Sequence, residues 1–262
     1  MALFLGGLAA AQSPNDLAQL AAFQQKTADY LKNIPNYTCK ERIYSFRGMG
    51  NRPLALIDRH EREVAVVYGR EMHLDGKDGA LAAPDQAGSA DSGLTSIGEF
   101  AGHLRSLFLN GRLVLDAKSR DSDRVGRRRA WRYEFRLPYN LSEWAIEIGG
   151  KRDTLAGKGV LWFDQKSLDL LRLRLVADEG IPPALPIRSI EVEIDLERKR
   201  IGASHTLLPA EASVQVRFFT GHVQKNQIEF RGCREYGTES TIRYDGGEAK
   251  ETAEPATTRP AK

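Results

Sequence analysis

Residues 157–196 constrain the fold of this chain most strongly, because apolar and charged side chains alternate along them. Leucine alternates with arginine over residues 171–175, and aliphatic residues alternate with acidic ones over residues 190–196. Residues 160–163 are apolar throughout, which predicts a further strand in a more enclosed position. Successive side chains of a strand point to opposite faces of its sheet. The stretch therefore predicts antiparallel strands with one apolar face and one polar face.

Opposite charges on neighbouring strands suggest which residues face each other. The expected pairs are Arg172 with Glu193, Arg174 with Glu191, Arg132 with Glu147 and Arg136 with Glu143. The last two pairs assume that residues 131–137 and 143–148 form one hairpin. A slip of one residue would move every side chain to the wrong face, so the pairs serve as predictions of register.

Two stretches show the apolar spacing of helices that cover a sheet. The first helix is predicted after Ser13, an N-cap residue that precedes Pro14, and it should end at Pro35. The second is predicted over residues 97–108, after a capping box that begins at Ser96. Each carries its apolar side chains on one face, which favours packing against an apolar surface.

The strand pattern continues from residue 112 to about residue 245 and, with the earlier strands, gives about eleven strands. A flat sheet of that size would be about 53 Å wide. Two helices, each about 10 Å wide, would cover less than half of its apolar face. The predicted fold is therefore mainly β (α+β), a strongly curved antiparallel sheet, or half-barrel, wrapping two amphipathic helices. A sandwich or closed barrel with a solid core is the alternative.

The chain is expected to form a single domain. Residues 1–11 have the apolar and small residues of a signal-peptide remnant, although a frayed apolar terminus is the alternative. Residues 12–245 form the curved-sheet domain, in which residues 75–93 are predicted as a flexible loop. Residues 246–262 have the composition of a disordered tail. No apolar run approaches the ~20 residues that a transmembrane helix needs.

The two cysteines, Cys39 and Cys233, are far apart in the sequence. In an oxidising compartment such a pair is a candidate disulfide that joins an early strand to a late one. Two buried thiols that never meet are the alternative. Together with the signal-like start, the pair favours an extracytoplasmic location, either periplasmic or secreted.

The sequence contains no recognisable catalytic, metal-binding or cofactor motif. None of the five histidines lies at the spacing of a metal site, and no nucleophile elbow or complete phosphate loop is present. We therefore expect no enzyme activity, no metal and no cofactor. A net charge of +3 is only mildly basic, and no aromatic residues interleave with a basic patch, so we expect no nucleic-acid partner.

Arg127, Arg128 and Arg129 follow Gly126 and predict a basic hairpin tip. Such a tip could contact an anionic surface or an acidic partner. A solvated turn without a partner is the alternative.

The run Gly159–Asp164, followed by Leu168 and then by Leu171–Leu173, resembles a hairpin of periplasmic lipoprotein-carrier (LolA-like) proteins and their sigma-factor-regulating relatives. The order of a helix, strands, a second amphipathic helix and a long run of strands is also similar. In that superfamily an unclosed half-barrel presents an apolar concave face to acyl chains. The resemblance therefore implies an extracytoplasmic protein that binds a lipid, a lipoprotein or another apolar ligand in the concave face of a bent sheet.

Eight side chains are expected near such a cavity. They are Trp131, Phe135, Trp144, Ile146, Trp162, Leu173, Val192 and Ile194. Ordinary core is the alternative for each of them, and the sequence pattern does not separate the two interpretations. The alternative function is therefore a cell-envelope interaction module with a solid core, a protein partner and no small-molecule ligand.

Overall fold

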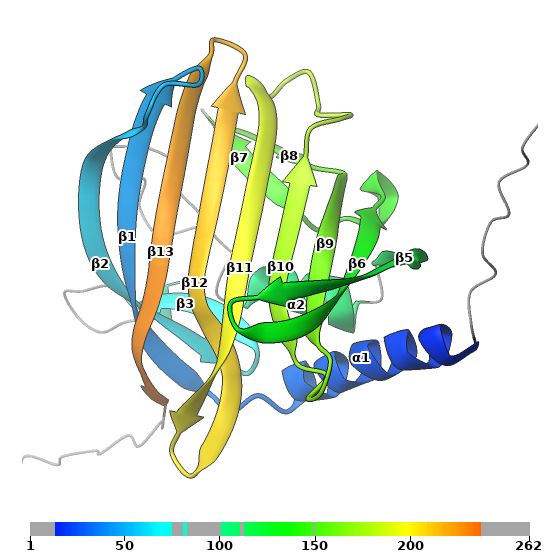
Figure 1. The fold of residues 1–262 in the computed structure, drawn as a ribbon. Helices are drawn as coiled ribbons and strands as arrows, with labels where there is room; N and C mark the ends of the chain where they lie inside the picture. Colours follow the sequence, from blue (N-terminus) through cyan, green and yellow to red (C-terminus); the bar gives the residue numbers. More distant parts are fainter. Residues whose placement is uncertain (1–13, 75–80, 83–100, 111–112, 149, 237–262) are drawn as a thin grey trace, which may run out of the picture.

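The computed structural model describes residues 14–74, 81–82, 101–110, 113–148 and 150–236, and its main feature is one large curved sheet (Figure 1). Its strands are β1 (Tyr37–Met49), β2 (Ala55–Val67), β3 (Arg70–Leu74), β4 (Leu81–Ala82), β5 (Val114–Val125), β6 (Arg128–Leu137), β9 (Gly157–Asp164), β10 (Leu170–Ala177), β11 (Ile187–Ile201), β12 (Ser204–Phe218) and β13 (His222–Glu235). Across the described residues these eleven strands follow the order β4-β3-β2-β1-β13-β12-β11-β10-β9-β6-β5. The end strands β4 and β5 do not pair with each other. The predicted mainly β, curved and unclosed antiparallel sheet is confirmed.

The remaining elements are two helices, a short 3-10 turn and a separate hairpin. Helix α1 spans Pro14–Lys32, helix α2 spans Gly102–Leu109, and the 3-10 turn η2 spans Tyr139–Leu141. The hairpin consists of β7 (Ala145–Ile148) and β8 (Lys151–Thr154). Helix α1 starts at the predicted proline. The predicted start of the second helix, the signal-like segment, most of the loop at 75–93 and the tail lie outside the described residues.

The predicted alternation of faces along β10 and β11 is correct, but the register differs by two residues. Arg172 lies opposite Asp195, and Arg174 lies opposite Glu193. The expected ion pairs still form diagonally, at 3.5 Å between Arg172 and Glu193 and 2.7 Å between Arg174 and Glu191. A shift of two residues keeps each side chain on its face, so the polar face was identified correctly.

The predicted hairpin of residues 131–137 with residues 143–148 is wrong. Strand β6 pairs with β5 and β9, whereas β7 pairs with β8. Pro138 and the 3-10 turn that follows it end β6 without a tight hairpin turn. The segment that contains the β7–β8 hairpin places Trp144, Ile146 and Leu155 in the core, where each is less than 9% exposed.

The first and last strands of the described chain are neighbours, and a disulfide joins them. Cys39 of β1 is bonded to Cys233 of β13 across a sequence separation of 194 residues. The ladder between β1 and β13 has an irregularity between Thr38 and Lys40, next to the bridge. The predicted pairing of the two cysteines is therefore present in the structure.

Gly159 marks a close approach between neighbouring strands. A Cβ atom there would lie 2.2 Å from the carbonyl oxygen of Arg174 and 2.5 Å from the Phe135 ring. We expect Gly159→Ala to lower the free energy of unfolding by about 1–3 kcal/mol, the range for overpacking a filled core. Gly157→Ala is a matched control, because its Cβ would meet nothing closer than 3.1 Å. Urea unfolding that ranks the two variants equally would contradict this prediction.

Candidate functional site

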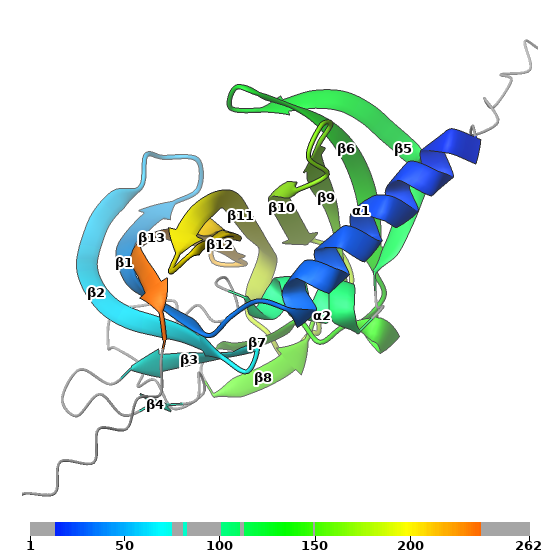
Figure 2. The same cartoon turned by 90° about the horizontal axis from the view of Figure 1, so that it is seen from below.

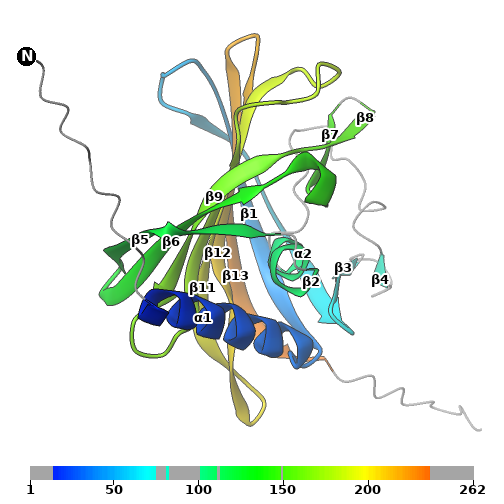
Figure 3. The same cartoon turned by 90° about the vertical axis from the view of Figure 1, so that its right-hand side faces the viewer.

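The sheet has an inner face that carries its aliphatic and aromatic side chains. This face is defined by Leu161, Leu173, Val192, Ile194 and Val214, each at most 2% exposed. Figures 2 and 3 show α2 and the β7–β8 hairpin on this side of the sheet, and α1 crossing its lower end. The opposite, outer face carries the ion pairs of β10 and β11. The inner face is the predicted site for an apolar ligand.

Helix α1 contacts the inner face mainly through one aromatic residue. The Phe23 ring stacks on Phe163 of β9 with ring centroids 4.4 Å apart, and it meets Tyr133 of β6 edge-on at 5.9 Å. Leu20 and Leu31 of the same helix are also buried. These apolar side chains of α1 therefore face the sheet, whereas Leu17 of the same helix is 51% exposed.

Helix α2 lies beside α1 on the same face. Its Phe108 ring approaches Phe163 edge-on at a centroid distance of 6.5 Å. Arg105 of α2 donates a hydrogen bond of 3.0 Å to the carbonyl oxygen of Leu31 in α1. At its start, the backbone N–H groups of residues 101 and 102 donate to the Glu71 carboxylate of β3. The two helices therefore form a connected cover over the aromatic part of the inner face.

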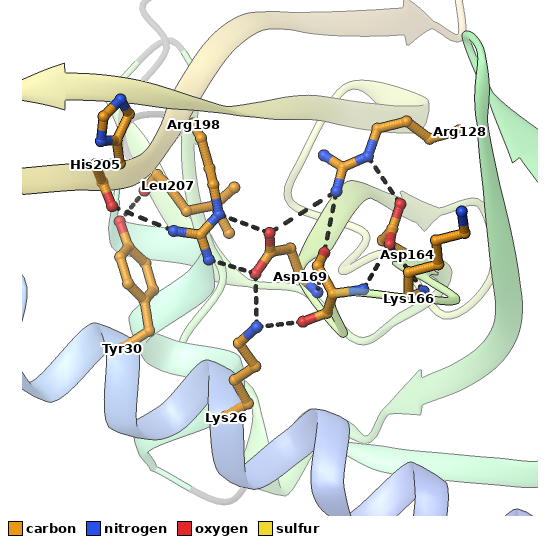
Figure 4. Close-up of polar contacts among 10 residues, drawn as sticks. Lys26, Tyr30, Arg128, Asp164, Lys166, Asp169, Arg198, His205 and Leu207 are labelled. Atoms are coloured by element: carbon orange, nitrogen blue, oxygen red, sulfur yellow. Dashed lines mark hydrogen bonds and ion pairs between the residues drawn. The ribbon is translucent and has the colours of Figure 1, made fainter.

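A cluster of charged side chains fixes α1 to the turn between β9 and β10 (Figure 4). We call Lys26, Arg128, Asp164, Asp169 and Arg198 the Asp169 cluster. The Asp169 carboxylate accepts two hydrogen bonds from Arg198, at 2.7 and 2.8 Å, and lies 2.9 Å from Lys26 Nζ. Its side chain is only 2% exposed. One buried carboxylate therefore holds together α1, β11 and the β9–β10 turn.

The second carboxylate of the cluster shapes the turn itself. Asp164 accepts hydrogen bonds from the backbone N–H groups of Lys166, at 2.9 Å, and Ser167, at 2.7 Å. Its other oxygen receives a 2.8 Å hydrogen bond from Arg128, which comes from the β5–β6 hairpin. The turn is thus tied to a third part of the chain.

The cluster also shifts protonation equilibria. Burial alone would raise the pKa of Asp169, but hydrogen bonds from Arg198 and Lys26 outweigh it and hold that pKa well below its usual value. The pKa of Asp164 is lowered in the same way, chiefly by backbone hydrogen bonds. Burial raises the pKa of Tyr30, whose hydroxyl donates to the Leu207 carbonyl oxygen. Both carboxylates are therefore ionised at neutral pH.

Seven of the eight residues predicted near a cavity lie in the core on the inner side of the sheet. Phe135, Trp144, Ile146, Leu173, Val192 and Ile194 are buried, and Trp131 is half-buried and packs against them. In this conformation the helices and the β7–β8 hairpin cover these side chains.

Trp162 is the exception. It lies on the outer face, where its indole N–H donates a 2.7 Å hydrogen bond to Asp123, and this bond lowers the pKa of Asp123. Its neighbours Leu161 and Phe163 are fully buried on the other face. The expectation that Trp162 lines the same cavity as Leu173 therefore needs correction. Because residues 160–163 are all apolar, periodicity could not assign their faces.

The predicted arginine tip is divided between two roles. Arg127 and Arg129 are exposed at the turn between β5 and β6. Arg128 is held by Asp164 and also donates a 3.0 Å hydrogen bond to the Ser167 hydroxyl. Contact of this tip with an anionic surface remains a prediction. For Arg128 to take part in it, Arg128 would have to break its contacts with the Asp169 cluster.

The outer face contains an open groove with a volume of about 510 Å³. Tyr44 and Phe46 of β1 line one side of it, and Arg172 of β10 lines the other. Most of the remaining lining is charged or polar. Burial raises the pKa of Glu193 in this groove, and Asp195 adds to that effect while Arg172 opposes it. This polar groove does not suit an acyl chain.

The residues that hold the helices over the inner face have no distinctive sequence pattern. Acidic residues on the polar positions of strands and turns are expected to be solvated, yet Asp169 and Glu41 are 3% and 2% exposed. Glu41 contacts Arg62 and lies 3.9 Å from His73 Nδ1 on the inner side. Within the described ranges, no group of three His, Cys, Asp or Glu side chains is arranged to hold a metal ion. No helix in the described part of the chain combines the length and apolarity needed to cross a bilayer.

Comparison with known proteins finds distant structural similarity only. No protein-family model matches the chain, and no curated protein matches it. A LolA superfamily protein from Nitrosomonas europaea is 11% identical, with 87% of this chain and 95% of that chain covered and a TM-score of 0.35. A DUF1329 family protein from Desulfovibrio piger is 10% identical, with 87% and 96% covered and a TM-score of 0.39.

An outer membrane lipoprotein-sorting protein domain from Vibrio parahaemolyticus is 8% identical, with 84% of this chain and 92% of that chain covered and a TM-score of 0.38. The first of these structures is described as a LolA superfamily protein, and LolA-like proteins are the ones that residues 157–196 resemble. With TM-scores below 0.5, none of these similarities assigns a function to this chain.

Proposed function

We propose that this protein binds the acyl chain of a lipid or lipoprotein, or another apolar ligand, on the inner face of its sheet beneath α1. The observation that carries the proposal is how α1 covers this face. The helix takes no part in strand pairing, so its movement would break none of the ladder hydrogen bonds of the sheet. It contacts the sheet through a few apolar side chains and through the Asp169 cluster.

Helix α1 and an acyl chain would gain comparable free energies from burial against the inner face. Burial of Leu20, Phe23 and Leu31 contributes roughly 5–9 kcal/mol, at about 1.5–3 kcal/mol for each side chain. An acyl chain that buries about 14 methylene groups would gain roughly 11 kcal/mol before its ordering cost. An acyl ligand can therefore compete with α1 for the same apolar surface.

The Cys39–Cys233 disulfide supports a location outside the cytoplasm. Disulfides persist in oxidising compartments and are rare where thiols are kept reduced. An extracytoplasmic protein with a coverable apolar face is suited to carry a ligand that water would not dissolve.

The three tryptophans provide an internal test of where a ligand binds. Trp131 and Trp144 lie on the inner side, whereas Trp162 lies on the outer face. In variants that keep one tryptophan and replace the other two by phenylalanine, a brominated fatty acid should quench Trp131 and Trp144 saturably. It should leave Trp162 unquenched, because bromine quenches an indole only at close range. Equal quenching of all three, or no saturable quenching, would contradict the proposal.

Mass spectrometry of organic extracts is the second measurement. The purified full-length protein should release an acyl-containing species in near-stoichiometric amount. If extracts contain none and the brominated probe also fails, a non-enzymatic envelope interaction module with a solid core becomes the better account.

A further inference from the structure

Three strand connections meet at the end of the sheet opposite α1 (Figure 1). They are the β1–β2 turn, the β10–β11 loop and the β12–β13 turn, and together we call them the loop end. The N–H of Gly50 donates a 2.8 Å hydrogen bond to the Gly221 carbonyl, and the N–H of Phe219 donates to Pro186 at 3.2 Å. These bonds fix the three connections against one another, so the loop end is one ordered surface.

Large apolar side chains are exposed at and next to this surface. Phe219 at the tip of the β12–β13 turn is 70% exposed, and Met49 at the end of β1 is 43% exposed. Leu56 and Ile57 at the start of β2 are 54% and 45% exposed. Met49 lies against the β12–β13 turn, since a Cβ atom at Gly221 would lie 3.3 Å from its sulfur. Neighbouring exposed apolar side chains such as Met49 and Phe219 mark a place of interaction, whereas single scattered ones do not.

The same surface is rich in arginine. Residues 46–57 and 217–224 contain Arg47, Arg52 and Arg217 and no acidic residue, and Arg188 lies beside them on β11. Arg52, Arg188 and Arg217 form no ion pair with another residue in the described part of the chain. The acidic residues of the neighbouring β10–β11 loop, Asp178 and Glu179, are held by Lys158 at 2.9 and 3.0 Å.

We propose that the loop end docks on the surface of an anionic phospholipid bilayer. Phe219 and Met49 would enter the boundary between headgroups and acyl chains, and the arginines would contact the lipid phosphates. A protein partner of acidic character would satisfy the arginines, but it would not require an exposed Phe219 at the tip. The proposal rests on the exposed residues of the loop end and is independent of whether α1 covers a ligand site.

The charge requirement is tested by vesicle flotation with the full-length protein. Each arginine near an anionic surface strengthens binding about fivefold. The variant Arg52→Gln/Arg188→Gln/Arg217→Gln should therefore bind vesicles of 30% phosphatidylglycerol in phosphatidylcholine about 100-fold more weakly than the wild type. The variant Arg124→Gln/Arg127→Gln/Arg129→Gln removes the same charge at the arginine tip, where all three side chains are exposed. If the loop end makes the contact, this variant should bind like the wild type. A larger loss in this variant than in the loop-end variant would assign the contact to the arginine tip and overturn the proposal.

The insertion of Phe219 is tested separately with an environment-sensitive fluorophore. A label on Phe219→Cys should shift to the blue when these vesicles are added. A label on Ala203→Cys, exposed in the β11–β12 turn at the other end, should not shift. Equal binding to vesicles of phosphatidylcholine alone, equal loss in both arginine variants, or equal shifts of both labels would overturn the proposal. A failure to extract a bound lipid would affect only the proposed function.

Discussion

Replacement of both Cys39 and Cys233 by alanine is expected to lower the free energy of unfolding by about 5 kcal/mol. The disulfide closes a loop with a sequence separation of 194 residues, and in the chain-entropy model a loop of this length restricts the unfolded chain strongly. The bridge also joins β1 to β13, neighbouring strands near the two ends of the described chain. Urea unfolding of the wild type and the double variant measures the difference.

A reducing agent is the control for this prediction. It should lower the midpoint of the wild type to that of the double variant and leave the variant itself unchanged. Thiol labelling of denatured, unreduced wild-type protein should find no free cysteine, since both cysteines are in the bridge. If the free energy of unfolding of the double variant lies within about 1 kcal/mol of that of the wild type, the disulfide contributes little and strand pairing holds β1 and β13 together.

The faces of the sheet could be predicted from the sequence because a period of two is a local property. Leu173, Val192 and Ile194 were assigned to the apolar face, and all three are at most 1% exposed. The register could not be fixed from charges alone. Arg172 lies opposite Asp195, yet it also lies 3.5 Å from Glu193, so the same charges fit two registers of equal parity.

The polar contacts that hold α1 could not be predicted because they join distant parts of the chain. Lys26 lies on the first helix, Asp169 in the β9–β10 turn and Arg198 on β11. In the sequence, Asp169 resembles any acidic turn residue. Its burial depends on helix α1, which packs over it. The sequence around residue 169 gives no sign of that packing. Sequence patterns therefore identified the apolar surface but missed the contacts that keep it covered.

Replacement of Asp169 by asparagine is expected to lower the free energy of unfolding by about 2 kcal/mol at neutral pH, as for the loss of hydrogen bonds to a charged group whose partners are partly exposed. The Asp169 side chain is 2% exposed, and without its charge Lys26 and Arg198 would lose the carboxylate that they share. Asp195→Asn is the matched control. Asp195 pairs with Arg172 on the outer face at 29% exposure, and a partly exposed pair contributes about 0–1 kcal/mol.

The pH dependence of the free energy of unfolding shows whether Asp169 stabilises the protein through its charge or through packing alone. The pKa of Asp169 is lower in the folded protein than in the unfolded chain. Its contribution is therefore complete above the unfolded pKa of about 3.9 and is lost as the pH falls below that value towards the folded pKa. The stability difference between the wild type and Asp169→Asn should be constant from neutral pH to about pH 5 and shrink in more acidic solution. A stability difference that persists unchanged in acid would show that Asp169 acts through packing and not through its charge.

The same substitution also tests whether the Asp169 cluster holds α1 over the inner face. If it does, Asp169→Asn should increase the affinity of the protein for the brominated fatty acid. An unchanged affinity for the probe would show that Asp169 stabilises the fold without controlling access to the inner face.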